Sequence, residues 1–157
     1  MKIKITGIGS YIPALKIHNT DFDKHVFLNE DGSAFAYPND VVISKFKGIT
    51  GIEQRRYAED HLNSSDLAFF ASEKAIEDAK IDPETIDYII YAHNFGDVNH
   101  GTIQTDTLPS LATRVKNKLQ IKNPKCVAYA ILFGCPDWME GLHQPNALLL
   151  LEWPNVV

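Results

Sequence analysis

Cys135 is the residue in this sequence whose position most favours covalent chemistry. It follows Gly134, precedes Pro136 and comes directly after the apolar run at residues 126–133. Proline is favoured at the first residue of a helix, because its missing N–H would have no partner there. Unpaired N–H groups and the positive end of a helix dipole favour a thiolate over a thiol. The spacing therefore predicts a nucleophilic cysteine, with a small apolar residue packed at a strand end as the alternative.

The second cysteine is not a plausible disulfide partner for the first. Cys126 and Cys135 lie nine positions apart along the predicted strand, a separation of about 30 Å in an extended chain. A disulfide needs Cα atoms within about 7 Å of each other. We therefore expect two free thiols, which suit a reducing compartment.

The elements that must position Cys135 follow an alternating order. Residues 126–133 are apolar on both alternating faces, as in an inner strand covered on both sides. The pattern also predicts strands over residues 2–8 and 87–93, a helix over 66–80 opened by Ser64 or Ser65, and a helix over about 109–119. This order is typical of an α/β domain with a mostly parallel sheet and helices on its faces. Sites in such sheets gather at the carboxyl ends of strands, where Cys135 lies.

Shorter elements are predicted between the first strand and the long helix. Asn19 and Asn39 are each expected to cap a short helix. Gly48 is expected to end the second of these helices. Arg55 and Arg56 follow on a short extended segment, where we interpret them as solvated surface charges, with a phosphate contact as the alternative.

The bulk properties exclude several classes of function. The chain has 157 residues and a net charge of −5, and it has no basic stripe of the kind that nucleic acid requires. No apolar stretch reaches the length of a membrane span or a secretion signal, so a cytoplasmic protein is expected. His93 and His100 raise the question of a metal site, but no further ligands have suitable spacing, and no metal is expected.

Several short segments form a characteristic series along the chain. They lie at residues 5–13 (ITGIGSYIP), 50–56 (TGIEQRR), 65–68 (SDLA), 86–90 (IDYII), 109–112 (PSLA), 134–135 (GC) and 141–142 (GL). In this order the sequence resembles the β-ketoacyl-acyl-carrier-protein synthases III, which have the thiolase fold. The resemblance implies a thiolase-like layered fold of which residues 1–147 form the N-terminal half, followed by an atypical tail at 148–157.

The resemblance also implies a reaction. Cys135 matches the position of the acyl-accepting nucleophile in a decarboxylative Claisen condensation of fatty-acid or related polyketide synthesis. The cysteine takes the primer from an acyl-coenzyme A, and malonyl-acyl-carrier protein then loses carbon dioxide and attacks the acyl-enzyme. Backbone N–H groups at the turn would hold the oxyanion. The coenzyme A thioester is a substrate, and no bound cofactor or metal is implied.

The implied partners are acyl-coenzyme A, acyl-carrier protein, and either a second copy of the chain or a complementary second half. In relatives the residue at the position of Leu108 approaches the acyl pocket of the partner in a homodimer. The family's enolate-stabilising His and Asn come from the second half of the fold, and no histidine here matches that His. We therefore expect a truncated chain without condensation activity.

Among the departures from the family pattern, three follow Cys135 in the sequence. Asp137 stands where relatives tend to carry glycine. Pro145 falls inside the predicted helix after Cys135, where it removes a hydrogen bond. The tail at 148–157 resembles a shifted reading frame more than the family's continuation, although an altered true terminus is the alternative.

Two other functions remain open at this point. In the first, the chain is a non-catalytic half-fold that either assembles with a partner or is the inert product of a broken gene. In the second, it is an unrelated cysteine thioesterase or hydrolase. The hydrolase hypothesis needs a base beside Cys135, and His93 and His100 are the candidates.

Overall fold

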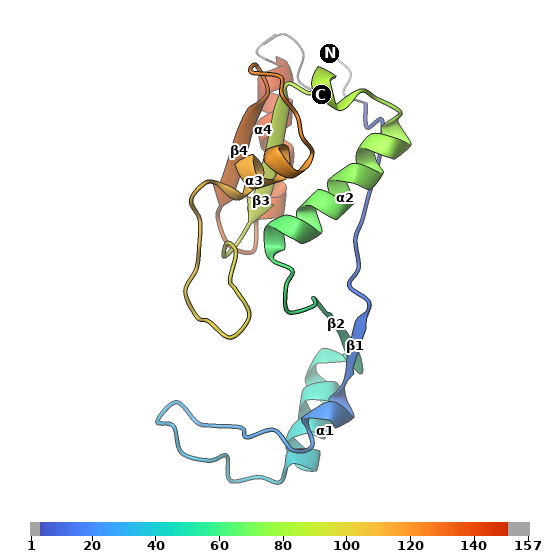
Figure 1. Ribbon diagram of the computed structural model, residues 1–157. Coiled ribbons are helices and arrows are strands. Elements are labelled where there is room, and N and C mark those ends of the chain that lie inside the picture. The colour runs from blue at the N-terminus through green and yellow to red at the C-terminus, as the bar shows by residue number, and fades with distance from the viewer. Residues whose placement is uncertain (1–3, 151–157) are drawn as a thin grey trace. The chain divides into compact units, whose positions relative to one another are not determined.

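A computed structural model describes residues 4–150, which divide into two compact units. One unit contains residues 12–59, and the other combines residues 4–11 with 60–150. Figure 1 labels the helices and strands of both units. Within residues 4–150, no helix is both long and apolar enough to cross a bilayer.

The larger unit is built on a pair of parallel strands. Strand β3 (Tyr88–His93) pairs with β4 (Val127–Leu132), in a register that joins Tyr88 to Val127 and His93 to Leu132. The unit's helices are α2 (Ser64–Ala79), the short η2 (Pro83–Thr85), α3 (Leu111–Lys118) and α4 (Asp137–Leu150). In Figure 1, α3 lies in front of the two strands and α4 behind them. The predicted α/β arrangement, with a parallel sheet and helices on its faces, is confirmed.

Two groups of apolar side chains form the core of this unit. Leu111, Ala112 and Val115 are buried on one face of α3. The second group contains the buried residues Ile86, Ile121 and Cys126, with Ile76, Ile81, Ile89 and Leu119 packed against them. Helix α3 packs against both β3 and β4.

Helix α2 begins with a capping box that differs from the predicted cap. Asn63, rather than Ser64 or Ser65, is the N-cap, and the carboxylate of Asp66 accepts a hydrogen bond of 2.8 Å from the Asn63 N–H. Ser65 is instead buried, where its hydroxyl donates to Asp97. The helix ends at Ala79, and its C-cap, Lys80, adopts a left-handed conformation with φ 55°.

The strand predicted over residues 2–8 does not form in the described part, residues 4–8. These residues have no regular structure, and residues 2 and 3 lie outside the described chain. Added Cβ atoms on Gly7 and Gly9 would collide with the backbone of α2. The Ile8 N–H donates to Asp78 at 2.9 Å. Packing on a helix has thus replaced pairing with a strand.

Strand β4 also differs from the prediction of a fully covered inner strand. It pairs with β3 alone among the described strands. Val127, Tyr129 and Leu132 are each more than two-fifths exposed. The apolar content of residues 126–133 correctly predicted a strand, but it did not show how much of the strand this chain covers.

The smaller unit joins an antiparallel strand pair to one helix. Strand β1 (Leu15–His18) pairs with β2 (Gln54–Tyr57), and η1 (Asn19–Phe22) and α1 (Asn39–Thr50) lie between them in sequence.

The helix ends predicted in this unit were wrong by one to three residues. Pro38 occupies the N-cap of α1, because the Asn39 amide instead donates to the carbonyls of Asp23 and His25 at 2.8 and 2.7 Å. The helix ends at Gly51 with φ 68°, and not at Gly48. His18 occupies the N-cap of η1, and Asn19 is its first residue.

Candidate functional site

Cys135 lies on an exposed turn between β4 and α4. Gly134 has φ 84°, a left-handed conformation that disfavours side chains, and nothing lies within 4 Å of the place where its Cβ would be. Backbone conformation therefore calls for glycine here. The Asp137 N–H donates to the Gly134 carbonyl at 3.0 Å and closes the turn. This turn presents the sulfur at the carboxyl end of a parallel strand, as predicted.

Helix α4 begins one residue later than predicted, so Pro136 precedes its first residue, Asp137. The Met139 and Glu140 N–H groups donate to the Pro136 carbonyl at 2.9 and 3.2 Å. The Cys135 N–H, by contrast, donates to no backbone carbonyl within residues 4–150. This amide is therefore free to donate to an anion formed next to the sulfur.

Leu108, the second predicted site residue, lies in the loop before α3. Its side chain is 81% exposed, while the backbone around it is held firmly. The Arg114 guanidinium donates to the carbonyls of Leu108 and Pro109 at 3.0 and 2.9 Å. The Leu108 N–H donates to Asp106 at 3.3 Å. The loop therefore holds an exposed apolar side chain in a defined place, and no hydrogen bond joins it to the Cys135 turn among the described residues.

The arginine that holds Leu108 is part of a buried polar network that sequence analysis missed. Asp97 is 2% exposed, and its carboxylate accepts from Arg114 at 2.9 Å and from the N–H and hydroxyl of Ser65 at 2.8 and 2.7 Å. Asp106 also accepts from Arg114, at 2.8 Å. Backbone hydrogen bonds between Asp97 and Asp106 close the intervening loop. An aspartate directly after Gly96 was the available signal, but its partners are distant in sequence.

The network shifts the pKa values of its members in opposite directions. Burial alone would lower the pKa of Arg114, but hydrogen bonds to Asp106 and Asp97 outweigh it and raise that pKa. The hydrogen bond from Arg114 lowers the pKa of Asp106. Both shifts favour the charged forms of Arg114 and Asp106, so this ion pair persists at neutral pH.

The two histidines considered as bases lie in different surroundings. A Cβ on Gly141 of α4 would lie 3.1 Å from the Ala92 Cβ, so Ala92 faces α4. Side chains alternate along a strand, so His93 is on the face of β3 opposite to α4. His93 is 8% exposed, and its Nδ1 has no hydrogen-bond partner within the described chain. His100 is exposed and pairs with Asp60 at 3.2 Å. No hydrogen bond among the described residues joins either imidazole to Cys135.

Within residues 4–150, no three His, Cys, Asp or Glu side chains are grouped closely enough to hold a metal ion. Cys126 is free, as predicted. It is also buried, and burial raises the pKa of its thiol.

Comparison with curated proteins identifies similar sequences. No protein-family model matches the chain. A β-ketoacyl-[acyl-carrier-protein] synthase III 1 of Vibrio cholerae is 34% identical over 142 residues, which cover 90% of this chain and 38% of that protein. A β-ketoacyl-[acyl-carrier-protein] synthase III of Staphylococcus haemolyticus is 37% identical over 142 residues, with the same coverage. The chain thus spans about two-fifths of the length of these relatives.

Solved structures give the same result for the fold. The β-ketoacyl-[acyl-carrier-protein] synthase III of Thermus thermophilus superposes with a TM-score of 0.68 at 26% identity, covering 95% of this chain and 39% of that one. A tetronic acid condensing enzyme superposes with a TM-score of 0.72 at 19% identity, covering 98% of this chain and 41% of that one. The second likeness is one of fold alone.

Proposed function

Because the chain belongs to the β-ketoacyl-[acyl-carrier-protein] synthase III family, whose fold it shares over about two-fifths of its relatives' length, we propose that it is the nucleophile-bearing part of an acyltransferase. In this proposal Cys135 accepts an acyl group from an acyl-coenzyme A. One observation carries it. The exposed Cys135 follows a glycine turn at the carboxyl end of β4 and directly precedes α4.

The proposed step is a thioester exchange. The Cys135 thiolate attacks the carbonyl carbon of the acyl-coenzyme A, and the negative charge moves to the carbonyl oxygen. The Cys135 N–H, which donates to no described carbonyl, is suited to stabilise that oxyanion. When the carbonyl re-forms, the bond to coenzyme A breaks, and its thiolate leaves and takes a proton from water. A new sulfur–carbon bond replaces the old one, so no oxidant or metal is needed.

Intact-mass spectrometry tests this step directly. Incubation with acetyl-coenzyme A should add one acetyl group to the chain. Cys135→Ala should abolish the addition, because it removes the attacking sulfur. Cys126→Ala is the matched control and should leave the addition unchanged, because Cys126 is buried. Equal acetylation of the wild type and Cys135→Ala would refute the proposal.

We infer that the second stage, condensation with malonyl-acyl-carrier protein, requires structure beyond this chain. The chain spans about 38% of the length of its relatives, and the family's enolate-stabilising His and Asn match no position in it. The expected result is acylation of Cys135 without a condensation product. Steady formation of acetoacetyl-carrier protein by the purified chain would contradict this expectation.

Leu108 is proposed to line the acyl pocket of a second copy of the chain. Its side chain is 81% exposed on a backbone fixed by Arg114, as expected of a residue that inserts into a partner. Leu108→Ala should change the ratio of octanoyl to acetyl transfer to Cys135. Ile103→Ala, in the same loop and 96% exposed, is the matched control and should leave that ratio unchanged. An equal change in both variants would remove Leu108 from the site.

A role as a non-catalytic assembly partner is the second candidate. The observation that favours it is the exposure of apolar side chains around the Cys135 turn and on α4, where Phe133, Trp138 and Leu142 are each more than half exposed. The hydrolase hypothesis has less support, because no hydrogen bond within residues 4–150 joins His93 or His100 to Cys135. Failure of Cys135 to accept any acyl group, together with stable binding of a complementary polypeptide, would favour the assembly role.

A further inference from the structure

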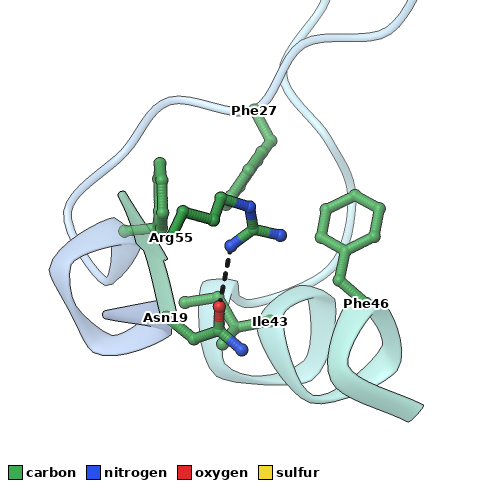
Figure 2. A pocket seen from close by; sticks show the side chains of 6 residues that line it. Asn19, Phe27, Ile43, Phe46 and Arg55 are labelled. Carbon is green, nitrogen blue, oxygen red and sulfur yellow. Dashed lines mark hydrogen bonds between the residues drawn. The ribbon is translucent and has the colours of Figure 1, made fainter. Parts of the chain in front are cut away.

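A cavity in the smaller unit contains an arginine that the proposed reaction does not use. It has a volume of about 220 Å³ and lies between η1, the segment after it, α1 and β2. Its lining consists of Asn19, Phe22, Phe27, Ile43, Phe46 and Arg55. Figure 2 shows the Arg55 guanidinium directed into the space beside Phe27, Phe46 and Ile43. Arg55 is therefore not the simple solvated charge that the sequence predicted.

The Arg55 guanidinium is held in place by its neighbours. One Nη1–H group donates to the Asn19 side-chain oxygen at 2.9 Å (Figure 2). Asn19 is itself fixed, because its amide donates to the Ile52 carbonyl at 2.7 Å. The guanidinium also lies 5.9 Å from the centre of the Phe22 ring, within the range of a cation–π contact. The group is thus oriented before any ligand arrives.

This oriented cation has no counter-ion in the described chain. None of the six lining residues is an acid, and Arg55 forms no ion pair within residues 4–150. A guanidinium has five N–H donors, and the described residues accept from only one of those on Arg55. A charge beside apolar groups is costly when it is unpaired. The remaining donors match the two oxygens of a carboxylate.

The rest of the cavity lining favours a ligand with a hydrocarbon part. Four of the six lining side chains are hydrocarbon: three phenylalanines and one isoleucine. Phe27 and Phe46 lie with their ring centres 6.2 Å apart. A cavity of roughly 150 Å³ accommodates a benzene molecule, so this larger cavity has room for a short hydrocarbon chain or one ring in addition to a carboxylate.

We propose that this cavity is a binding site for a small monocarboxylate with an apolar body, such as hexanoate. The carboxylate pairs with the free donors of Arg55, and the body lies among Phe27, Ile43 and Phe46. The site belongs to a different unit from Cys135, so its existence does not depend on the proposed acyl transfer.

The proposal is tested by titrating the full chain with hexanoate at pH 7. The NMR signals of the Arg55 side-chain N–H groups report binding. Saturable shifts are expected, with a dissociation constant on the order of millimolar or tighter for so small a ligand. Hexan-1-ol, which keeps the hydrocarbon chain and lacks the charge, should bind at least about tenfold more weakly than hexanoate. Acetate, which keeps the charge and lacks the hydrocarbon chain, should also bind at least about tenfold more weakly. Absence of saturable hexanoate binding, or equal binding of hexan-1-ol, would overturn the proposal.

The neighbouring arginine provides a matched control variant. Arg55→Gln should weaken hexanoate binding about tenfold or more. Arg56→Gln removes the same charge one residue away, where the guanidinium instead donates to the Pro13 and Ala14 carbonyls at 3.2 and 3.3 Å. It should change the affinity less than twofold. Equal losses in both variants would mean that only the net charge matters, and the site would be rejected.

Two further variants, Arg55→Lys and Phe46→Ala, separate the loss of a ligand contact from the loss of folded structure. Lysine keeps the charge but loses the planar pair of donors, so Arg55→Lys should bind hexanoate with an affinity between those of the wild type and Arg55→Gln. Phe46→Ala should weaken hexanoate more than acetate, because it removes part of the apolar lining. If Phe46→Ala, folded by circular dichroism, bound hexanoate as tightly as the wild type, the ligand would lie elsewhere and the proposal would fail.

Discussion

Asp137 is the charged residue closest in sequence to the candidate nucleophile. As the first residue of α4 it stabilises the helix, since an acidic side chain in the first turn interacts favourably with the helix dipole. The same carboxylate opposes a second negative charge on Cys135, two residues earlier. The site thus contains an electrostatic conflict, and the resemblance predicts glycine rather than aspartate at this position.

We predict that Asp137→Asn makes Cys135 more reactive. Removing the carboxylate removes a repulsion of about 1 kcal/mol or less between charges near the protein surface, so the alkylation rate at pH 7 should rise by up to about fivefold. Iodoacetamide labelling followed by mass spectrometry measures this rate.

Glu140→Gln is the control for this comparison, because Glu140 lies in the same first turn but farther along the helix. Its effect on the alkylation rate should be smaller. An unchanged or slower rate in Asp137→Asn would show that the carboxylate does not act on the sulfur.

At the scale of elements, the start of α2 combines a cap with an ion pair. Asp66 accepts from the Asn63 N–H and pairs with Lys118 of α3 at 2.6 Å. Burial tends to raise the pKa of Asp66, but the hydrogen bonds from Lys118 and Asn63 outweigh it and lower that pKa below the usual 3.8. One carboxylate therefore stabilises the end of α2 and its contact with α3.

We predict that Asp66→Ala lowers the free energy of unfolding by about 1–2 kcal/mol at pH 7, since it removes a cap and a charge-assisted hydrogen bond. Because the pKa of Asp66 is depressed in the folded state, its stabilisation is complete above pH 4. It is lost as the pH falls through the lower, folded pKa. Urea denaturation of both proteins between pH 7 and pH 3 should show the difference shrinking below pH 4. A difference that stays constant down to pH 3 would contradict this role.

Pro145 is the second element-scale feature, and it lies within α4 as predicted. It leaves the Gly141 carbonyl without its helical donor. We predict that Pro145→Ala raises the free energy of unfolding by up to about 3 kcal/mol, measured by thermal or urea denaturation. Gln144→Ala, one residue earlier, should change it by less than about 0.5 kcal/mol. A destabilised Pro145→Ala protein would show that α4 has adapted to the proline.

These elements show what the sequence could predict. Apolar patterning located α2, β3, α3 and β4: a repeating apolar face identified the helices, and short apolar runs identified the strands. It failed for residues 4–8, where alternation suggested a strand but Gly7 and Gly9 allow the backbone to lie directly on α2. Cys135 was identifiable because its turn is local in sequence. The network of Ser65, Asp97 and Arg114 was not, since its members come from separate segments.

At the scale of the whole molecule, the described residues 4–150 leave many large apolar side chains exposed. Phe133, Trp138 and Leu142 are each more than half exposed, and all three lie at or beyond the end of β4. Trp138 and Leu142 are four residues apart and therefore lie on the same face of α4, and an exposed apolar face is a feature of interaction sites. The chain covers less than half of its relatives' length.

We therefore predict that the purified chain associates with itself as its concentration rises, as measured by sedimentation velocity. Leu142→Lys should shift the association to higher concentration, because it places a charge on the apolar surface. Ile103→Lys, at a single exposed position in a loop, should have little effect. A monomer at every concentration would contradict the prediction.

The two cysteine thiols differ in one further respect. Cys126 is 4% exposed in the core and Cys135 is open to solvent, so a thiol reagent that is excluded from the core should count one group per folded molecule and two per unfolded molecule. The number of reactive thiols per molecule therefore reports whether the chain is folded, without an added label. A preparation that yields two groups at once has lost the packing around β4, and measurements of acyl transfer made on it would describe denatured protein.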